Sequence, residues 1–443
     1  MPELWAGTDA GKAAHHCTVI DTDGTKVLSR RVPNNEPELL ELIGDVLALA
    51  EDGPVTWAVD LNAGGGALLI ALLVNHGQRL LYIPGRTVHH ASRGYRGDGK
   101  TDAKDAYVIA DQARMRRDLQ PLQEWDEIAV DLKILTARRY DLAADRTRAI
   151  NRMRAQLLEY FPALERAFDY AASKAALILL GPVRAIFSGP RRRLRRLAAL
   201  SESPEYAQYE GDPPPCDTPH PTPRTDPRRS PGQDLTGYQT PASLRRVGPN
   251  RLATWLKNRK VRGAQAMADA AVAAAQAQHT AVAGESTAAA VVNALARAVM
   301  ALDDEIADID AKIAVRFREH RHAEVVLSMP GMGLLLGAEF IACTGGDMDA
   351  FGTAGRLAGV AGLAPVPRDS GRISGNMRRP HRYHRRLLRV FYLSAQIAAR
   401  FCLTSKAFYD RKRAEGKNHK QAILALARRR LDVLWALLRD QRH

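Results

Sequence analysis

The pattern of apolar and polar positions over residues 1–120 alternates between the strand period and the helix period. Short apolar runs predict strands at 4–8, 15–20, 26–32, 55–60 and 80–83. Apolar positions three and four apart predict helices at 36–49, 67–74 and 101–115. Three meandering strands followed by alternating helices and strands are the order of an RNase H-like sheet. We therefore expect an α/β, RNase H-like domain over residues 1–120.

Two later segments carry the narrow apolar stripe of long helices. Residues 125–180 lose the strand pattern and predict one long helix, with apolar positions at Ile128, Leu132, Leu135, Leu142 and Ile150. Residues 284–320 repeat this character, with a stripe at Val291, Leu295, Val299, Leu302, Ile306 and Ile309. Because a narrow apolar seam needs a partner, we expect an antiparallel or intermolecular coiled coil within 121–180 and 235–322.

The segment between these helices has a different composition. Residues 204–241 hold ten of the chain's 24 prolines and few aliphatic residues, and a basic run at 191–196 precedes them. Such a stretch cannot bury enough apolar area to offset the entropy of ordering it. We therefore predict a Pro-rich, disordered insertion over 181–234.

Charge and cysteine content narrow the class of protein. The 443 residues carry a formal net charge of +15, which favours a polyanionic partner such as nucleic acid. The four cysteines are scattered without zinc-ligand spacing, so a reducing cytoplasm is expected. The chain has no signal-peptide pattern and no uncharged apolar run of membrane-spanning length, so we expect no membrane partner.

Four aspartates are the first candidate site. Asp9 and Asp60 end two of the predicted strands, and Asp102 and Asp105 lie three apart at the start of the 101–115 helix. Carboxylates gathered at one end of a sheet repel one another unless a cation binds them, and oxygen ligands suit Mg²⁺. Two such ions about 4 Å apart can stabilise the attacking and leaving oxygens of a phosphodiester. The pattern therefore indicates nucleic-acid chemistry.

Each aspartate also has a structural interpretation. Asp102 and Asp105 could favour the helix dipole behind a Thr101 cap, and Asp9 and Asp60 could cap turns. The remaining aspartates of this region lack a placement at strand ends, and we predict that they are solvated: Asp98, Asp111 and Asp118.

The last region, 323–443, is predicted to be a basic helical domain. It opens on a Pro-Gly-Met-Gly turn in which Gly331 and Gly333 resemble a helix-hairpin-helix that offers backbone N–H groups to a DNA phosphate. Further on, Ser370 lies in a Gly-punctuated loop flanked by arginines suited to phosphate binding: Arg368, Arg372, Arg378, Arg379, Arg382, Arg385, Arg386 and Arg389.

The Ser370 hydroxyl could be a covalent nucleophile for a phosphodiester. From the residues alone, a basic loop that binds the DNA backbone, with Ser370 only forming a turn, is the more frequent arrangement. Tyr383 is a competing nucleophile, because phenols also attack phosphates.

Three motifs in this order resemble the IS-one-ten family of insertion-sequence transposases, which are serine-dependent DEDD recombinases related to the pilin-gene invertases. They are Gly7-Thr8-Asp9, Lys100-Thr101-Asp102-x-x-Asp105, and Ala361-Gly-Leu-Ala-Pro365 followed by Asp369-Ser370-Gly371. The resemblance covers nearly the whole chain except 181–234. It implies a RuvC-like domain with the acidic tetrad, a coiled coil that joins protomers, and a C-terminal domain with the serine.

By this resemblance, Asp9, Asp60, Asp102 and Asp105 bind Mg²⁺ and Ser370 attacks DNA to form a phosphoserine link. The expected partners are donor and target DNA, a structured bridge RNA as guide, and further copies of the chain in a dimer or tetramer. The sequence departs from the family pattern at Asp60, where glutamate is usual, and in the long insertion.

Rival interpretations remain open at this level. A RuvC-like, Mg²⁺-dependent junction nuclease would use water as its nucleophile and leave Ser370 idle. A sugar-kinase-like ATPase would share the phosphate turn at 7–12 but needs a second Asp-x-Gly loop, for which the sequence offers no convincing candidate. A catalytically dead DNA-binding remnant would owe its inactivity to the insertion.

Overall fold

The computed structural model describes residues 2–61, 64–95, 99, 101–119, 121–122, 126–181, 238–372, 374–378 and 380–440. Two compact units are present, and they are described one at a time: 1–130 with 344–382, and 131–343 with 383–443. The predicted disordered insertion and its basic run lie outside the described residues, apart from Gly181 at its start.

The first unit contains a mixed five-stranded sheet in the order β3-β2-β1-β4-β5. Its strands are β1 (Leu4–Ala10), β2 (Ala14–Ile20), β3 (Lys26–Pro33), β4 (Val55–Val59) and β5 (Arg79–Tyr82). The first three form an antiparallel meander, while β1, β4 and β5 run parallel. All five strands were predicted from the apolar pattern, and their existence is confirmed.

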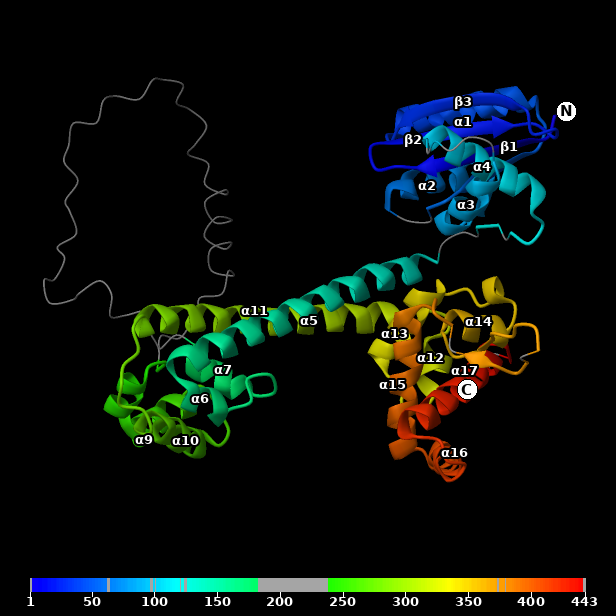
Figure 1. Cartoon of the computed structure of the whole chain (residues 1–443). Helices are drawn as coiled ribbons and strands as arrows, with labels where there is room; N and C mark the ends of the chain where they lie inside the picture. The colour runs from blue at the N-terminus through cyan, green and yellow to red at the C-terminus, as the bar shows by residue number, and fades with distance from the viewer. Residues whose placement is uncertain are drawn as a thin grey trace, which may run out of the picture. The chain divides into compact units, whose positions relative to one another are not determined.

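Helices cover both faces of this sheet (Figure 1). On one face are α1 (Glu36–Ala50) and, after the short turn η1 (Gly64–Gly66), α2 (Ala67–Asn75). On the other are α3 (Gly85–Ala91), η2 (Ser92–Gly94) and α4 (Asp102–Met115). The pattern had not predicted α3. Because side chains alternate along a strand, Leu4 and Ala6 pack toward α1 and α2, which leaves Trp5 and Gly7 toward α4.

The rest of the first unit carries the serine loop. After η3 (Asp349–Phe351) comes α14 (Ala354–Val360), whose Thr353 cap accepts a hydrogen bond from the Arg356 N–H at 3.2 Å. Two short strands, β6 (Val366–Pro367) and β7 (Met377–Arg378), then pair antiparallel. They hold the segment between them as a hairpin loop.

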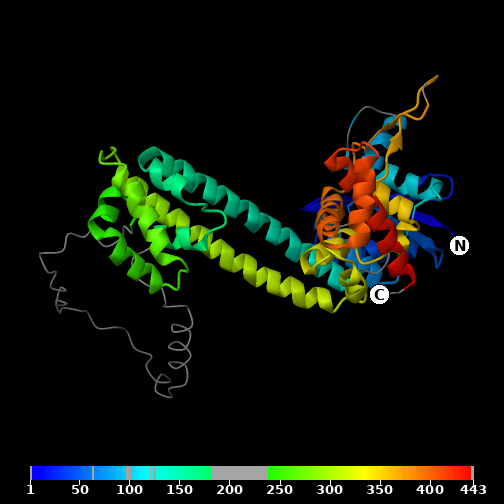
Figure 2. The ribbon, with the colours of Figure 1, turned by 90° about the horizontal axis from the view of Figure 1, so that it is seen from below.

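Two long helices dominate the second unit: α5 (Glu127–Tyr160) and α11 (Glu285–Arg318). They lie side by side in both views (Figures 1 and 2), and their ion pairs show that they are antiparallel. As the residue number increases along α5, the number of the partner on α11 decreases: Asp131 pairs with Arg316, Arg139 with Asp310, and Arg146 with Asp303. The predicted pairing of long helices is therefore present within one chain.

α11 is also the one described helix that is long and apolar enough, by length and composition, to cross a membrane. Four of its apolar residues, Ala289, Val292, Ala296 and Val299, belong to a buried cluster, whereas Val291 and Val315 are exposed. Asp303 and Asp310 of the same helix form ion pairs with α5. α11 is therefore buried only in part, since 28% of its apolar window lies inside the protein.

The prediction of one continuous helix over 125–180 is wrong beyond Tyr160. The chain breaks there and continues as α6 (Pro162–Ala167) and α7 (Lys174–Leu180). Pro162 has no N–H to continue the helix and instead occupies the first turn of α6, where none is needed. Two further helices follow the undescribed segment, α9 (Pro241–Lys257) and α10 (Ala264–Gln276).

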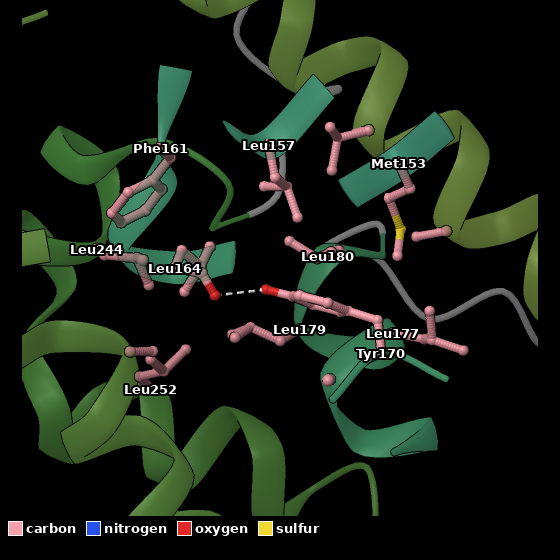
Figure 3. Packing of buried hydrophobic residues seen from close by; sticks show 14 of the residues in the cluster. Met153, Leu157, Phe161, Leu164, Tyr170, Leu177, Leu179, Leu180, Leu244 and Leu252 are labelled. Carbon is pink, nitrogen blue, oxygen red and sulfur yellow. Dashed lines mark hydrogen bonds between the residues drawn. The ribbon is translucent and has the colours of Figure 1, made fainter. Parts of the chain in front are cut away.

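These shorter helices build a separate apolar core at one end of the long pair. Leu157, Leu164, Leu180 and Leu252 are fully buried in it (Figure 3). Tyr170 lies in the same core and donates a hydrogen bond from its hydroxyl to the Leu164 carbonyl at 2.8 Å (Figure 3). Burying this many side chains stabilises the end of the helix pair through the hydrophobic effect.

The C-terminal helices are α12 (Ala323–Ser328), α13 (Leu334–Thr344), α15 (Arg385–Phe401), α16 (Leu403–Ala414) and α17 (His419–Asp440). α15 and α16 meet at 101°. Arg430 of α17 is buried and donates hydrogen bonds to the Ser394 hydroxyl at 2.7 Å and to the Pro330 carbonyl. Burial lowers the pKa of its guanidinium to about 10. This arginine thereby fixes the turn between α12 and α13.

Candidate active site

The first two acids lie at the carboxyl ends of neighbouring parallel strands. Asp9 is the penultimate residue of β1, and Asp60 directly follows β4, which pairs with β1 up to Thr8 and Val59. The backbone N–H of Ala10 donates to Asp60 Oδ1 at 3.1 Å. This hydrogen bond holds the Asp60 carboxylate beside the end of β1, as the strand pattern predicted.

Helix α4 brings the other two acids to the same end. Its Thr101 cap accepts a hydrogen bond from the Lys104 N–H at 3.2 Å, so Asp102 and Asp105 occupy the first turn. The helix crosses β1 in close contact at Gly7, where a Cβ would lie 2.3 Å from the Ala106 carbonyl oxygen. Glycine is therefore required for α4 to approach the sheet. Asp9, two residues further along β1, is on the α4 face.

Two of the four acids, Asp60 and Asp105, interact through their charges. Burial raises the pKa of Asp60, hydrogen bonds from backbone N–H groups oppose this, and the negative charge of Asp105 raises it further. Burial lowers the pKa of His16, and the negative charge of Asp102 opposes this fall. His16 of β2 pairs with Asp9 of β1. Among the described residues, no three acids, histidines or cysteines lie close enough together to chelate one metal ion. The structure therefore brings the acids to one end of the sheet but not into one chelating group.

Other residues around Asp60 were missed by the sequence interpretation. His15 is buried on β2, and the Asp60 charge opposes the fall in its pKa that burial causes. Tyr82, at the end of β5, has its pKa raised by burial and by Asp60. A Cβ on Gly85, at the start of α3, would lie 3.5 Å from Asp60 Oδ2. The His15-His16 pair in the strand that follows Asp9 was the one signal that could have predicted any of them.

Asp111 is a correction to the sequence analysis. It was predicted to be solvated, yet it is buried on α4. Its carboxylate forms an ion pair with Arg114 at 2.7 Å and accepts a hydrogen bond from the Tyr95 hydroxyl at 2.7 Å. A buried charge requires such partners, so Asp111 has a structural role. Asp118 is exposed and paired with Arg116 as expected of a surface residue, and Asp98 lies outside the described residues.

Ser370 is exposed at the loop of the β6–β7 hairpin. The loop is closed by the Arg368 N–H, which donates to the Asn376 carbonyl at 2.9 Å, and by the Asn376 N–H, which donates to Asp369 Oδ1 at 3.0 Å. The chain turns immediately after the serine at Gly371, whose φ is +57°. These contacts leave the serine hydroxyl at the surface of the loop, where a large substrate can reach it.

The arginines predicted around the serine fall into two groups. Five of them are exposed, form no ion pair among the described residues and can bind a polyanion: Arg368, Arg372, Arg378, Arg382 and Arg385. By contrast, Arg386 stacks over the ring of Tyr140 at 4.4 Å, and Arg389 pairs with the buried Glu339 at 2.8 Å. Those two contacts attach α15 to α5 and α13. Arg379 lies outside the described residues.

The two glycines of the predicted helix-hairpin-helix differ in environment. Gly331 has a φ of +77°, and a Cβ there would lie 2.8 Å from the Ser394 carbonyl oxygen of α15. Its glycine identity is therefore needed for packing of the turn against α15. Gly333 is exposed, and no neighbour would lie within 4 Å of a Cβ added there. Of the two, Gly333 is the more accessible to DNA.

Comparisons with known proteins agree with this geometry. A family model for the DEDD domain of IS110 elements, described as Transposase, matches residues 6–162, and a second, described as Transposase IS116/IS110/IS902 family, matches 323–410. The chain is 57% identical over 437 residues to the insertion element IS900 42 kDa protein of Mycobacterium paratuberculosis, covering 99% of this chain and 96% of that protein. The chain belongs to the IS110 family of transposases.

Two further relatives extend the comparison. The insertion element IS116 44.8 kDa protein of Streptomyces clavuligerus is 46% identical over 99% of this chain and 95% of that protein. The mini-circle putative transposase for IS117 of Streptomyces coelicolor is 27% identical over 99% of this chain and 95% of its own length. The resemblance inferred from the motifs is confirmed at the level of the family.

Membership in the IS110 family defines the general chemistry. An IS110 transposase acts on DNA and belongs to a class of enzymes that cleave and rejoin it, and its DEDD domain implies a divalent metal. The four aspartates lie within the first matched region, and Ser370 lies within the second. At 48.6 kDa the chain is heavier than the 42 kDa relative that it covers almost completely, so it contains sequence that this relative lacks.

Proposed function

We propose that this IS110 transposase cuts and rejoins DNA through a phosphoserine intermediate formed by Ser370. The observation that carries the proposal is the exposed Ser370 on a hairpin loop that is flanked in sequence by exposed arginines, in a chain of this family. Arginine binds phosphate oxygens in a bidentate manner, so these side chains would hold the DNA strand beside the hydroxyl and stabilise charge on the phosphorus centre.

The proposed reaction has two balanced steps. Ser370 Oγ forms a bond to the phosphorus while the bond from phosphorus to the DNA 3′ oxygen breaks. The hydroxyl proton passes to a carboxylate acting as base, and the departing 3′ oxygen takes up a proton. In the second step a DNA 3′-hydroxyl attacks the phosphoserine and returns the serine to its free form. The number of phosphodiester bonds is conserved, so no ATP is required.

The acids have two proposed roles in this scheme. Asp9, Asp60, Asp102 and Asp105 lie at one end of the sheet without forming a chelating group, so their side chains would have to draw together to hold Mg²⁺, and the bound ion would supply positive charge to the scissile phosphate. All four donors are carboxylates, and the mutual repulsion of Asp60 and Asp105 would be relieved by a cation. A carboxylate in this group would accept the serine proton. The meeting of Ser370 with the acids, in one protomer or between two, is part of the proposal.

The fold class and the partners are also part of the proposal. The strand order 3-2-1-4-5, with β1, β4 and β5 parallel, is consistent with an RNase H-like, RuvC-like domain.

We infer a cytoplasmic homo-oligomer whose α5–α11 pair forms a coiled coil, and a bridge RNA that guides target choice. Sequencing the RNA that co-purifies with the protein, expressed together with the DNA flanking its gene, tests the guide: recovery of host transcripts alone would contradict it.

The serine nucleophile is tested by Ser370→Ala. We expect the variant to lose strand exchange and the covalent protein–DNA adduct while it keeps DNA binding, because the hydrogen bonds described for the hairpin come from Arg368, Asp369 and Asn376 and not from the serine hydroxyl. The adduct is measured as a shift of labelled DNA on a denaturing gel, and binding by fluorescence anisotropy.

Two controls make this test specific. Ser374→Ala changes an exposed serine in the same loop and should leave the adduct intact. Tyr383→Phe removes the competing nucleophile and should also leave it intact. An adduct that persists in Ser370→Ala but disappears in Tyr383→Phe would assign the nucleophile to the tyrosine. Metal-dependent cutting without an adduct in the unmodified protein would favour a water-using nuclease, and soluble protein without any cutting would favour an inactive remnant.

A further inference from the structure

Several cations on α16 and α17 are paired with an acid three or four residues away. Lys406 pairs with Asp410 at 2.8 Å on α16, and Arg428 pairs with Asp432 at 3.1 Å on α17. At the end of α16, Lys412 pairs with Glu415 at 2.8 Å. Exposed pairs of this kind contribute little to stability, and they leave little net charge for a polyanion.

Two arginines of the same helices are arranged differently. Arg411 of α16 and Arg429 of α17 converge on one ring, because their guanidinium carbons lie 5.0 Å and 5.1 Å from the centroid of Phe408. Both arginines are exposed, and Phe408 is half-buried. Within residues 383–440, as far as they are described, neither arginine forms a salt bridge with a carboxylate. We refer to Phe408, Arg411 and Arg429 as the Phe408 surface.

Lys412 Nζ lies 5.5 Å from the centroid of the same ring, and its partner Glu415 supplies one carboxylate for these three cations, so a net positive charge remains at the ring. The negative face of an aromatic ring attracts a guanidinium by roughly 0.5–1 kcal/mol at an exposed site, which is enough to orient both arginines. The repulsion between them is relieved when an anion binds. The guanidinium groups face solvent from two different helices, and their paired N–H groups can donate hydrogen bonds to the oxygens of a phosphodiester backbone.

We propose that the Phe408 surface binds the phosphate backbone of the DNA on which the transposase acts, as a contact separate from the arginines of the serine loop. The net charge of +15 and the family's action on DNA favour a nucleic acid over a protein partner. Arg411 and Arg429 lie beyond the region 323–410 that the family model matches. The proposal depends on DNA binding by the chain and not on the chemistry of Ser370.

The experiment measures binding of the full chain to a labelled DNA duplex of arbitrary sequence, with salt varied from about 50 to 200 mM. We expect Arg411→Ala/Arg429→Ala to reduce the slope of log affinity against log salt by about 1.8, since each phosphate contact contributes about 0.9. At about 100 mM salt the affinity should fall roughly 10- to 100-fold. Arg411→Lys/Arg429→Lys keeps two cations and should retain most of the slope.

The matched control is Lys406→Ala/Arg428→Ala, which removes two cations from the same two helices, both already paired with acids. It should change affinity less than threefold, and both double variants should keep the melting temperature of the unmodified chain. An unchanged salt slope in Arg411→Ala/Arg429→Ala overturns the proposal. A loss seen only with RNA of the same sequence, or only in self-association of the protein, overturns it as well. All of these readouts are independent of strand exchange, so they stand apart from the test of Ser370.

Discussion

At the scale of single residues, Asp60 has a carboxylate that lowers the stability of the fold but suits the binding of a cation. Its carboxylate is half-buried at the end of β4, and burial together with the charge of Asp105 raises its pKa. A raised carboxyl pKa means that the folded protein favours the neutral form, so the ionised form at neutral pH costs stability. Carboxylates with such a raised pKa are typical of functional sites, and a bound cation would offset the free-energy cost of the charge.

The prediction at this scale concerns Asp60→Asn. In buffer with a metal chelator the variant should melt at a higher temperature than the unmodified chain, because the neutral amide removes the charge and its oxygen can still accept the Ala10 N–H. Mg²⁺ at ten times its dissociation constant should stabilise the unmodified chain by about 1.4 kcal/mol and the variant by less. Differential scanning fluorimetry with and without Mg²⁺ measures both effects.

Asp118→Asn is the control, because Asp118 is exposed and paired with Arg116 away from strand ends. It should leave the response to Mg²⁺ unchanged. Equal stabilisation of Asp60→Asn and the unmodified chain by Mg²⁺ would argue against Asp60 as a metal ligand.

At the scale of elements, the antiparallel pair of α5 and α11 leaves an apolar groove between the helices. Ile134, Leu135, Ala311 and Val315 line it. Ile134 and Val315 are 63% and 60% exposed, which is unusual for large apolar side chains facing each other on two helices. Asp131 and Arg316, which form an ion pair between the two helices, also line the groove. It is therefore the part of the pair on which a second protomer could pack.

We expect Ile134→Asp/Val315→Asp to weaken the proposed homo-oligomer. Covering an apolar side chain contributes about 1.5–3 kcal/mol, and a carboxylate in its place would have to be desolvated. Size-exclusion chromatography with light scattering should show a smaller assembly for the variant. Leu158→Asp, which changes a 50% exposed residue elsewhere on α5, should leave the assembly unchanged. An assembly of the original size in the double variant would rule out this groove as the interface.

At the scale of the whole molecule, the residues on either side of the segment 182–237 are in contact with each other. The side-chain amide of Gln239 donates to the Leu180 carbonyl, and Asn293 Nδ2 of α11 donates to the same oxygen at 3.1 Å. Leu180 and Gln239 are both fully buried. The core therefore forms from residues on both sides of the segment, which is what an insertion into an existing fold requires.

We predict that replacing residues 182–237 with a short Gly-Ser linker leaves the fold intact. The melting temperature should stay within a few degrees of that of the full chain, because the hydrogen bonds and the apolar core described at Leu180 are formed by residues on either side of the replaced segment. Thermal unfolding followed by circular dichroism measures this. A matched deletion of 258–263, between α9 and α10, should lower the melting temperature, since it removes the buried Val261. An unfolded linker variant would show that the segment belongs to the core.

Much of the fold was predictable because local periods encode local structure. The strand and helix patterns of residues 4–115 predicted the five strands and helices α1, α2 and α4, though not α3, and the placement of the acids at strand and helix ends followed from them. The helix break at Tyr160 was missed because the apolar positions continue past it, and a proline placed in a first turn resembles one placed inside a helix. The burial of Asp111 was missed because Tyr95, its hydrogen-bond partner, comes from another element.

The sequence by itself determined the period of each element, the order of acids and serine along the chain, and the positive charge that suits a DNA partner. These depend on residues a few positions apart, where side-chain spacing and backbone geometry are fixed. Only the tertiary structure decided that Gly331 is needed for packing, that Arg386 and Arg389 attach α15 to other helices, and that Arg411 and Arg429 share one aromatic ring. Each of these depends on burial and electrostatic contact between elements that the linear pattern does not bring together.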